Sequence, residues 1–161
     1  MSEEIFGAVQ KLPVNGTKKQ VVLQCAPLLT GIKLSNLLNV RAYQKEEVFR
    51  IFEGSPVCCR VLYEFQGRLS ILLYRPGMLA AYLEREDVKK MMTSFGYENP
   101  DLEETLNRIA DAYQDHMNGK RGFPHEIGLV LGYPPVDVEG FIEKEGRDFL
   151  YSGYWKVYGN L

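Results

Sequence analysis

The clearest pattern of apolar and polar positions lies between residues 57 and 75. Apolar residues alternate with other residues over 57–64 and again over 69–74, which predicts two strands joined as a hairpin. A two-residue loop at Gln66-Gly67 would split the two apolar rows onto opposite faces. We therefore expect a three-residue loop, Phe65-Gln66-Gly67, with Gly67 in the left-handed conformation of a bulged turn. This loop places on one face Val61, Tyr63, Leu69 and Ile71.

Helical spacing of apolar residues, bounded by Gly, Pro and Asn, predicts helices on both sides of the hairpin. Asp101 with Glu104 has the spacing of a capping box, which marks one helix start. Pro27 must kink or end the helix that contains it, because it lacks an N–H. The expected helices are Glu3–Leu12, one beginning at Thr17, Lys45–Glu53, one opening at Pro76-Gly77 with a break near Arg85 to Asp87, and one from Asp101 to Asn118-Gly119; the run 34–40 is expected to be a strand.

The last third of the chain predicts two short helices and a strand. Apolar residues fall at helical positions on both sides of Gly132, and we expect Val138, Phe141 and Ile142 to face inward. Alternation over residues 151–158 predicts a final strand that joins the hairpin sheet. Neither an internal repeat nor a linker interrupts the sequence. We therefore expect residues 1–161 to form a single α+β domain, with a small antiparallel sheet around the hairpin covered by several helices on one face and a helical hairpin near the C-terminus.

Composition places the chain among ordinary globular proteins. It has 161 residues and 18.4 kDa, with 45% hydrophobic and 25% charged residues. A formal charge of -2 gives no global field that would attract nucleic acid or anionic lipid. No segment approaches the ~20 apolar residues that a membrane-spanning helix needs. These features predict a cytoplasmic protein without a membrane partner.

The three cysteines suggest a thiol hypothesis. Cys25, Cys58 and Cys59 are odd in number and two are adjacent, so a disulfide framework is not expected. Cys25 precedes a helix disruption at Pro27, where backbone groups are freed. A nucleophilic thiolate needs a neighbouring cation or imidazole, and His125 is the candidate base. A buried free cysteine is the alternative.

Metal and phosphate motifs are incomplete. His125-Glu126 begins like a zinc-protease pair, but Leu129 occupies the position of the second histidine. We expect no metal site, and no cofactor follows from the sequence. The loop Gly119-Lys120-Arg121-Gly122 lacks the spacing of a phosphate-binding loop. Aromatic side chains near the C-terminus could form a stacking platform for a ligand: Tyr151, Tyr154 and Trp155.

The helical hairpin over residues 126–144 also has the skeleton of a helix-turn-helix. Between Glu126 and Asp148 there are six acidic residues and two basic ones, a net charge of 2 − 6 = −4. A recognition helix must approach phosphates, so this composition opposes DNA binding. A structural helical hairpin is the expected alternative.

Several motifs together resemble a bacterial family known as domain of unknown function 3793. They include Cys25-Ala-Pro27, the hairpin ending Leu73-Tyr74-Arg75, Phe123-Pro124-His125-Glu126-Ile127-Gly128 and Ser152-Gly153-Tyr154-Trp155-Lys156. The resemblance covers about Val21 to Asn160. It implies a small intracellular bacterial protein and supplies no reaction, cofactor or catalytic residue.

The sequence as a whole favours a non-catalytic binding or interaction module, because no set of nucleophile, base and orienting group can be assembled from it. Its partner would be a small molecule or a protein. The alternatives are a thiol-dependent enzyme or redox protein using Cys25 with His125, and a helix-turn-helix DNA-binding protein.

Overall fold

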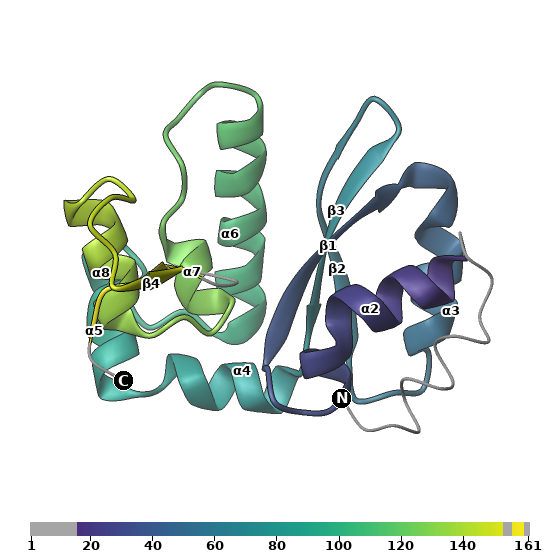
Figure 1. Cartoon of the computed structure of the whole chain (residues 1–161), viewed down its shortest axis with the longest axis horizontal. Coiled ribbons are helices and arrows are strands. Elements are labelled where there is room, and N and C mark those ends of the chain that lie inside the picture. The colour runs from purple at the N-terminus through teal and green to yellow at the C-terminus, as the bar shows by residue number, and fades with distance from the viewer. Residues whose placement is uncertain (1–15, 153–155, 160–161) are drawn as a thin grey trace. The chain divides into compact units, whose positions relative to one another are not determined.

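The computed structural model describes residues 16–152 and 156–159 (Figure 1). Its helices and antiparallel sheets confirm the α+β class. Contacts within the chain divide it into two compact units, residues 1–76 and 77–161. That the two units make up one domain stays a prediction. The expected helix Glu3–Leu12 lies outside the described residues.

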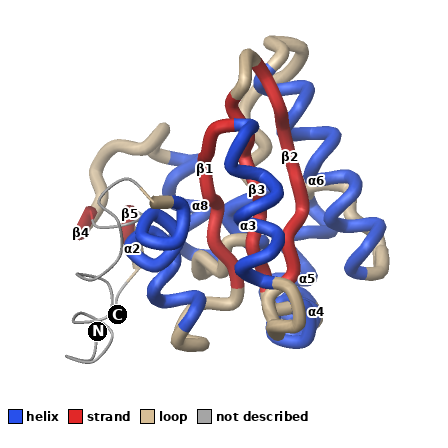
Figure 2. Tube along the Cα trace, turned by 90° about the vertical axis from the view of Figure 1, so that its right-hand side faces the viewer, coloured by secondary structure: helices blue, strands red, loops and turns tan. Residues whose placement is uncertain are grey.

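The first unit is a three-stranded antiparallel sheet with two α-helices on one face (Figure 2). The strand order is β1-β3-β2, so the central strand is the second half of the hairpin. Strand and helix positions agree with the expected run 34–40 and the expected helix Lys45–Glu53. The elements are α2 (Thr17–Leu29), β1 (Ser35–Arg41), the 3₁₀ turn η1 (Ala42–Gln44), α3 (Lys45–Phe52), β2 (Cys58–Phe65) and β3 (Arg68–Tyr74).

The core of this unit lies between the sheet and its two helices. Leu38, Ile71 and Val61 are aligned across the three strands and carry apolar side chains on the helix side. The helices contribute a second layer of apolar residues to the same cluster: Val21, Cys25 and Leu28 from α2, and Val48 and Phe52 from α3. Burial of these side chains at ~25 cal/mol per Å² is what fixes the helices on the sheet.

The hairpin forms as predicted, but the predicted loop is wrong. Phe65 pairs with Arg68, so the loop has only two residues, Gln66 at φ 47° and Gly67 at φ 73°. Positive φ at both positions is typical of a type I′ turn, whose twist matches that of the flanking strands. The shift in parity is absorbed by a bulge between Val61 and Tyr63.

The bulge changes which residues share a face of the sheet. Val61 lies opposite Ile71, as expected, but Tyr63 lies opposite Ser70 and not on the Ile71 face. One extra residue in β2 thus lets a two-residue turn and a continuous apolar face coexist.

The C-terminal end of α2 is held by a guanidinium group. Pro27 lies inside the helix, which continues two residues further to Leu29. The Arg75 side chain donates to the Leu28 carbonyl from Nε at 3.1 Å and from Nη2 at 3.0 Å. Nη2 also donates to the Leu29 carbonyl at 3.1 Å. A cation at this end satisfies orphan carbonyls and complements the helix dipole.

The second unit is mainly helical, and its helix ends follow the sequence signals closely. The helical region that opens at Pro76 breaks at Arg85, as expected. Asp101 caps the next helix by accepting a hydrogen bond from the Glu104 N–H at 2.7 Å. The elements are α4 (Pro76–Leu83), α5 (Glu86–Ser94), α6 (Leu102–Met117), α7 (Glu126–Val130), α8 (Pro135–Glu143), β4 (Tyr151–Ser152) and β5 (Lys156–Val157).

Two expectations for the C-terminal region are wrong. The segment 151–158 does not join the hairpin sheet: β4 and β5 pair with each other as a separate two-stranded sheet. The two strands are antiparallel, and their described residues pair with each other, Tyr151 with Val157 and Ser152 with Lys156. The helical hairpin α7–α8 is confirmed, with Gly132 at φ 81° between the helices. Val138 is buried as expected, whereas Phe141 and Ile142 are 39% and 37% exposed.

None of the described helices combines the length and the apolar character that crossing a bilayer would require.

Candidate ligand-binding site

A cavity of about 290 Å³ lies in the second unit, around the start of α7 and the inner side of α8. Apolar and aromatic side chains form most of its described lining, among them Phe123, Ile127 and Phe141. Polar side chains enter at His125, Asp137 and Lys156. We call this cavity the His125 pocket.

Glycine and proline residues shape the helical hairpin α7–α8, which carries most of the His125 pocket. The left-handed conformation of Gly132 ends α7 and turns the chain towards Pro134-Pro135, where α8 begins. Gly128 lets the two helices approach closely, because a Cβ at this position would lie 3.1 Å from Val138 Cγ2. The pocket thus depends on a close approach that a larger residue at position 128 would hinder.

His125 is the residue immediately before α7 and is half-buried. Its ring meets Phe123 edge-on at a centroid distance of 5.5 Å and lies tilted to Phe141 at 6.0 Å. Among the residues that the structure describes, no hydrogen-bond partner faces its ring nitrogens. Burial lowers the pKa of His125 below its usual 6.5, while the neighbouring Glu126 acts in the opposite direction. Near neutral pH the ring is therefore an uncharged donor and acceptor that a ligand can use.

Asp137 ties α8 to the end of the chain. It lies in the first turn of α8 and is buried. Its Oδ1 accepts hydrogen bonds from the backbone N–H groups of Tyr158 at 2.9 Å and Gly159 at 3.3 Å. The helix N-terminus and these two donors stabilise the negative charge. Asp137 thus has a structural role at the edge of the pocket.

Lys156 enters the pocket from β5. Its Nζ donates a hydrogen bond to the Gly146 carbonyl and lies 4.7 Å from the centroid of the Phe149 ring. Within the described parts of the chain it forms no ion pair with a carboxylate. An ammonium group has three donors, so at least one remains for a bound molecule.

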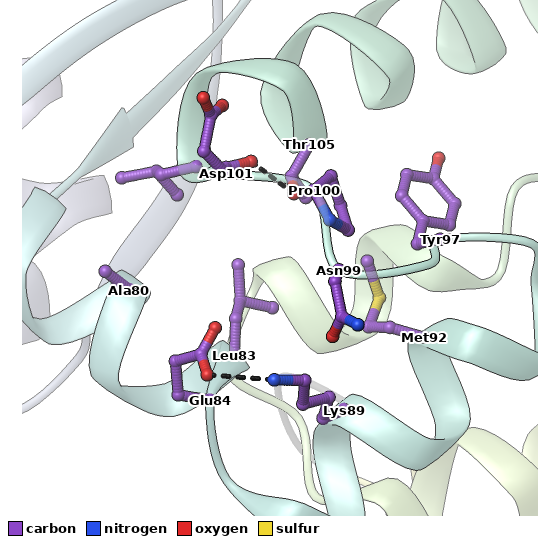
Figure 3. A pocket seen from close by; sticks show the side chains of 11 residues that line it. Ala80, Leu83, Glu84, Lys89, Met92, Tyr97, Asn99, Pro100, Asp101 and Thr105 are labelled. Atoms are coloured by element: carbon purple, nitrogen blue, oxygen red, sulfur yellow. Dashed lines mark hydrogen bonds and ion pairs between the residues drawn. The ribbon is translucent and has the colours of Figure 1, made fainter.

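A second cavity of about 90 Å³ lies elsewhere in the second unit (Figure 3). Its charged groups are already paired: Lys89 contacts Glu84 at 3.1 Å. Asp101 accepts from the Glu104 N–H, and the Thr105 hydroxyl donates to the Asp101 carbonyl at 2.8 Å. We interpret this smaller cavity as a packing feature, because its charged side chains already have partners within the protein.

Cys25, the predicted nucleophile, belongs to the first unit, whereas His125 belongs to the second. The Cys25 side chain is completely buried, and Asn36 Nδ2 lies 3.4 Å from its Sγ. Burial raises the pKa of Cys25 to about 11, against smaller opposing effects of Asn36 and Lys33. At neutral pH the residue is therefore a thiol and not a thiolate. A joint catalytic role for Cys25 and His125 stays a prediction.

The predicted aromatic platform lies largely beyond the residues that can be described. Tyr154 and Trp155 are outside them, and for Tyr151 only the backbone pairing with Val157 is described. Their role in ligand binding stays a prediction. Sequence reasoning missed Asp137 and Lys156 as pocket residues, and no spacing motif connects them to His125.

No metal site is evident in the described part of the chain, where no group of three or more His, Cys, Asp or Glu side chains converges.

Comparison with known families supports the resemblance seen in the sequence. The family described as "protein of unknown function (DUF3793)" matches residues 21–161. The chain belongs to the DUF3793 family. Searches among curated proteins and among solved structures returned no match. Membership in DUF3793 therefore places the chain among relatives without transferring a reaction to it.

Proposed function

We propose that this DUF3793 protein is a non-catalytic binding module that holds a small, mostly apolar molecule in the His125 pocket. One observation carries the proposal: the His125 pocket is mostly apolar, and the His125 imidazole is part of its lining. This ring has no hydrogen-bond partner among the described residues. Ligand pockets combine such apolar walls with a few placed polar groups. The ring nitrogens of His125 are not among the fully buried atoms that lack a partner, so water can bind them until a ligand displaces it.

The pocket supports binding better than catalysis. Its described lining contains no Ser, Thr or Cys that could act as a nucleophile. No carboxylate in the described part of the chain is hydrogen-bonded to His125, and Asp137 Oδ1 accepts from two backbone donors. Acting as a base in covalent catalysis, His125 would need an orienting carboxylate on one side and a Ser, Thr or Cys nucleophile on the other. The described lining supplies neither.

The proposal is tested by comparing ligand binding to the wild type with binding to a variant in which a larger side chain fills the pocket. Small aromatic probes at millimolar concentration are mixed with the full chain, and binding is followed by saturation-transfer NMR. We expect binding to the wild type and its loss in Leu131→Trp, because Leu131 lines the pocket and a larger ring would fill it. Leu23→Trp is the matched control, since Leu23 is 52% exposed on α2 in the first unit. Equal binding to both variants, or no binding to the wild type, would contradict the proposal.

We place the protein in the bacterial cytoplasm. The free thiols of Cys25, Cys58 and Cys59 support this location, because disulfides dominate in oxidising compartments. The resemblance of the motifs to a bacterial family supports the source.

The thiol-enzyme alternative has a direct chemical test. A reactive Cys25 would be alkylated under native conditions faster than the exposed Cys58. Because Cys25 is buried and its pKa is raised to about 11, we expect Cys58 to be labelled first. Peptide mapping by mass spectrometry after brief iodoacetamide treatment would report the order.

The DNA-binding alternative requires α8 to approach phosphates. The exposed side chains of this helix include Glu139 and Glu143, which would repel them. Helix α7 is also short, with 5 residues. We expect no retardation in a gel-shift assay at low salt, where non-specific association is strongest.

A further inference from the structure

We infer that the occupant of the His125 pocket is a small planar aromatic carboxylate, an inference that rests on the proposed function and specifies its ligand. Four observations support this choice: aromatic rings at edge-on or tilted angles, a cation without a counter-ion among the described residues, a neutral imidazole and a limited volume. Each restricts a different property of the ligand.

Aromatic rings at the pocket favour a planar ligand. The rings of His116, Phe123, His125 and Phe141 follow one another at centroid distances of 5.4, 5.5 and 6.0 Å. The last three line the cavity. Because these rings lie edge-on or tilted to one another and do not share a plane, an aromatic ligand beside them can contact the face of one ring and the edge of another. Such surfaces bind another aromatic ring with about 0.5–1.5 kcal/mol beyond simple burial.

Lys156 favours an anionic ligand. The other charged residue of the lining, Asp137, accepts hydrogen bonds at Oδ1 from the N–H groups of Tyr158 and Gly159. Lys156 donates to a neutral carbonyl and has no counter-ion among the described residues. Lys156 thus keeps donors for a ligand, and a ligand carboxylate would form a charge-assisted hydrogen bond with it.

His125 adds a second hydrogen-bonding group to the same cavity. As a neutral ring it has one N–H donor and one acceptor nitrogen, and neither has a partner among the described residues. The N–H can therefore donate to an oxygen of the ligand. This second contact distinguishes a carboxylate from a halide or another compact anion.

The volume limits the size of the ligand. Pockets for drug-sized ligands span about 300–1,000 Å³, and the His125 pocket, with about 290 Å³, lies at the small end of this range. This volume is suited to a molecule with one or two rings.

The experiment compares probes that differ only in charge or planarity. Dissociation constants of benzoate, benzamide, benzamidine and cyclohexanecarboxylate are measured by NMR titration of the full chain. We expect benzoate to bind about tenfold more tightly than benzamide, the effect of about one charge-assisted hydrogen bond. Benzamidine and cyclohexanecarboxylate should both bind more weakly than benzoate.

Two lysine variants test the source of the charge preference. Lys156→Met keeps the length of the side chain and should lower the affinity for benzoate much more than the affinity for benzamide, so that the preference for benzoate is lost. Lys144→Met is the matched control, because Lys144 also lies over an aromatic ring, 5.4 Å from the Tyr158 centroid, but is not part of the described pocket lining. This variant should keep the preference.

The outcomes separate the inference from the proposed function. If benzamide or benzamidine binds as tightly as benzoate, the inferred carboxylate of the ligand is contradicted, and the pocket remains a binding site. If cyclohexanecarboxylate binds as tightly as benzoate, the inferred planar ring is contradicted. If no probe binds the wild type, both proposals fail. Should Lys156→Met not fold, the ratio of benzoate to benzamide affinity in the wild type decides the question alone.

Discussion

The Tyr97 hydroxyl donates a hydrogen bond to Glu126 Oε1 at 3.2 Å, joining the segment after α5 to the first residue of α7. Arg121 Nη2 lies 3.6 Å from the same carboxylate oxygen. Glu126 is 4% exposed, so the carboxylate needs these partners in place of water. The pair fixes the start of α7 and thereby the position of the adjacent His125.

Tyr97→Phe should destabilise the protein by about 1–3 kcal/mol, because it removes a donor from a buried carboxylate. The ring contact with the Arg108 guanidinium, 4.1 Å from the centroid, is retained in this variant. Urea denaturation followed by circular dichroism measures the change. Tyr43→Phe is the control, since Tyr43 is 85% exposed. An equal and small effect in both variants would show that the hydrogen bond contributes little.

Gly140→Ala should destabilise the contact between α8 and the end of the chain. A Cβ at position 140 would come closer than 3.0 Å to three atoms of Tyr158. The backbone or the tyrosine must move, at a cost of about 1–3 kcal/mol. Gly122→Ala is the matched control, because a Cβ there meets no atom within 4 Å. A thermal-denaturation midpoint that falls only in Gly140→Ala would support the contact, and equal midpoints would contradict it.

The free energy of unfolding should fall as the pH rises from about 9 to 11. Burial raises the pKa of both Cys25 and Cys59 from 9.0 to about 11. Below pH 9 the thiols are protonated in both states and their contribution to stability is complete. Between the two pKa values the unfolded chain loses these protons first, so stability declines with pH.

Cysteine variants identify the groups that cause this alkaline loss. Cys25→Ala should reduce the slope of stability against pH in this range, whatever its effect on stability at neutral pH. Cys58→Ser should leave the slope unchanged, since Cys58 is exposed. Denaturation series at several pH values report both slopes. Part of the slope should persist in a Cys25/Cys59 double variant, because burial also raises the pKa of Tyr82 from 10.0 to about 12. An unchanged slope in the double variant would contradict the contribution of the two thiols.

Gln66→Asn should stabilise the hairpin by about 0.5–1 kcal/mol, because Asn tolerates positive φ better than Gln and type I′ turns prefer Asn-Gly. Gln66 has φ 47° in the two-residue loop. Gln66→Val serves as the opposite control, since a β-branched residue is strained at this angle. If both variants have the same midpoint in urea, the loop does not adopt the described turn.

The sequence predicted the individual elements better than their connections. Alternation around Val61 and Ile71 identified both hairpin strands, because period 2 is a local property of a half-buried strand. The same alternation could not reveal the bulge, which inserts a residue without changing the composition of the run. The predicted pairing of the segment 151–158 with the hairpin sheet was wrong for a related reason. Alternation of apolar residues predicts a strand but does not identify the strand with which it pairs.

The candidate site was only partly visible in the sequence. His125 was identified from the sequence, but as a candidate base for Cys25 and not as a pocket residue. Its neighbours in the pocket come from elements separated along the chain: Asp137 lies on α8 and Lys156 on β5. Their proximity depends on the packing of the helical hairpin against the end of the chain. Such tertiary contacts leave no fixed spacing in one sequence.

The extra residue of β2 has a consequence beyond the hairpin itself. In the described sheet β2 is an outer strand, and a regular outer strand offers evenly spaced N–H and C=O groups to any extended chain that meets it. The irregularity between Val61 and Tyr63 interrupts that spacing halfway along the strand. An extended chain from a second molecule could form regular hydrogen bonds with only one half of β2 at a time. The bulge that aligns the core residues therefore also hinders the growth of intermolecular β-aggregates.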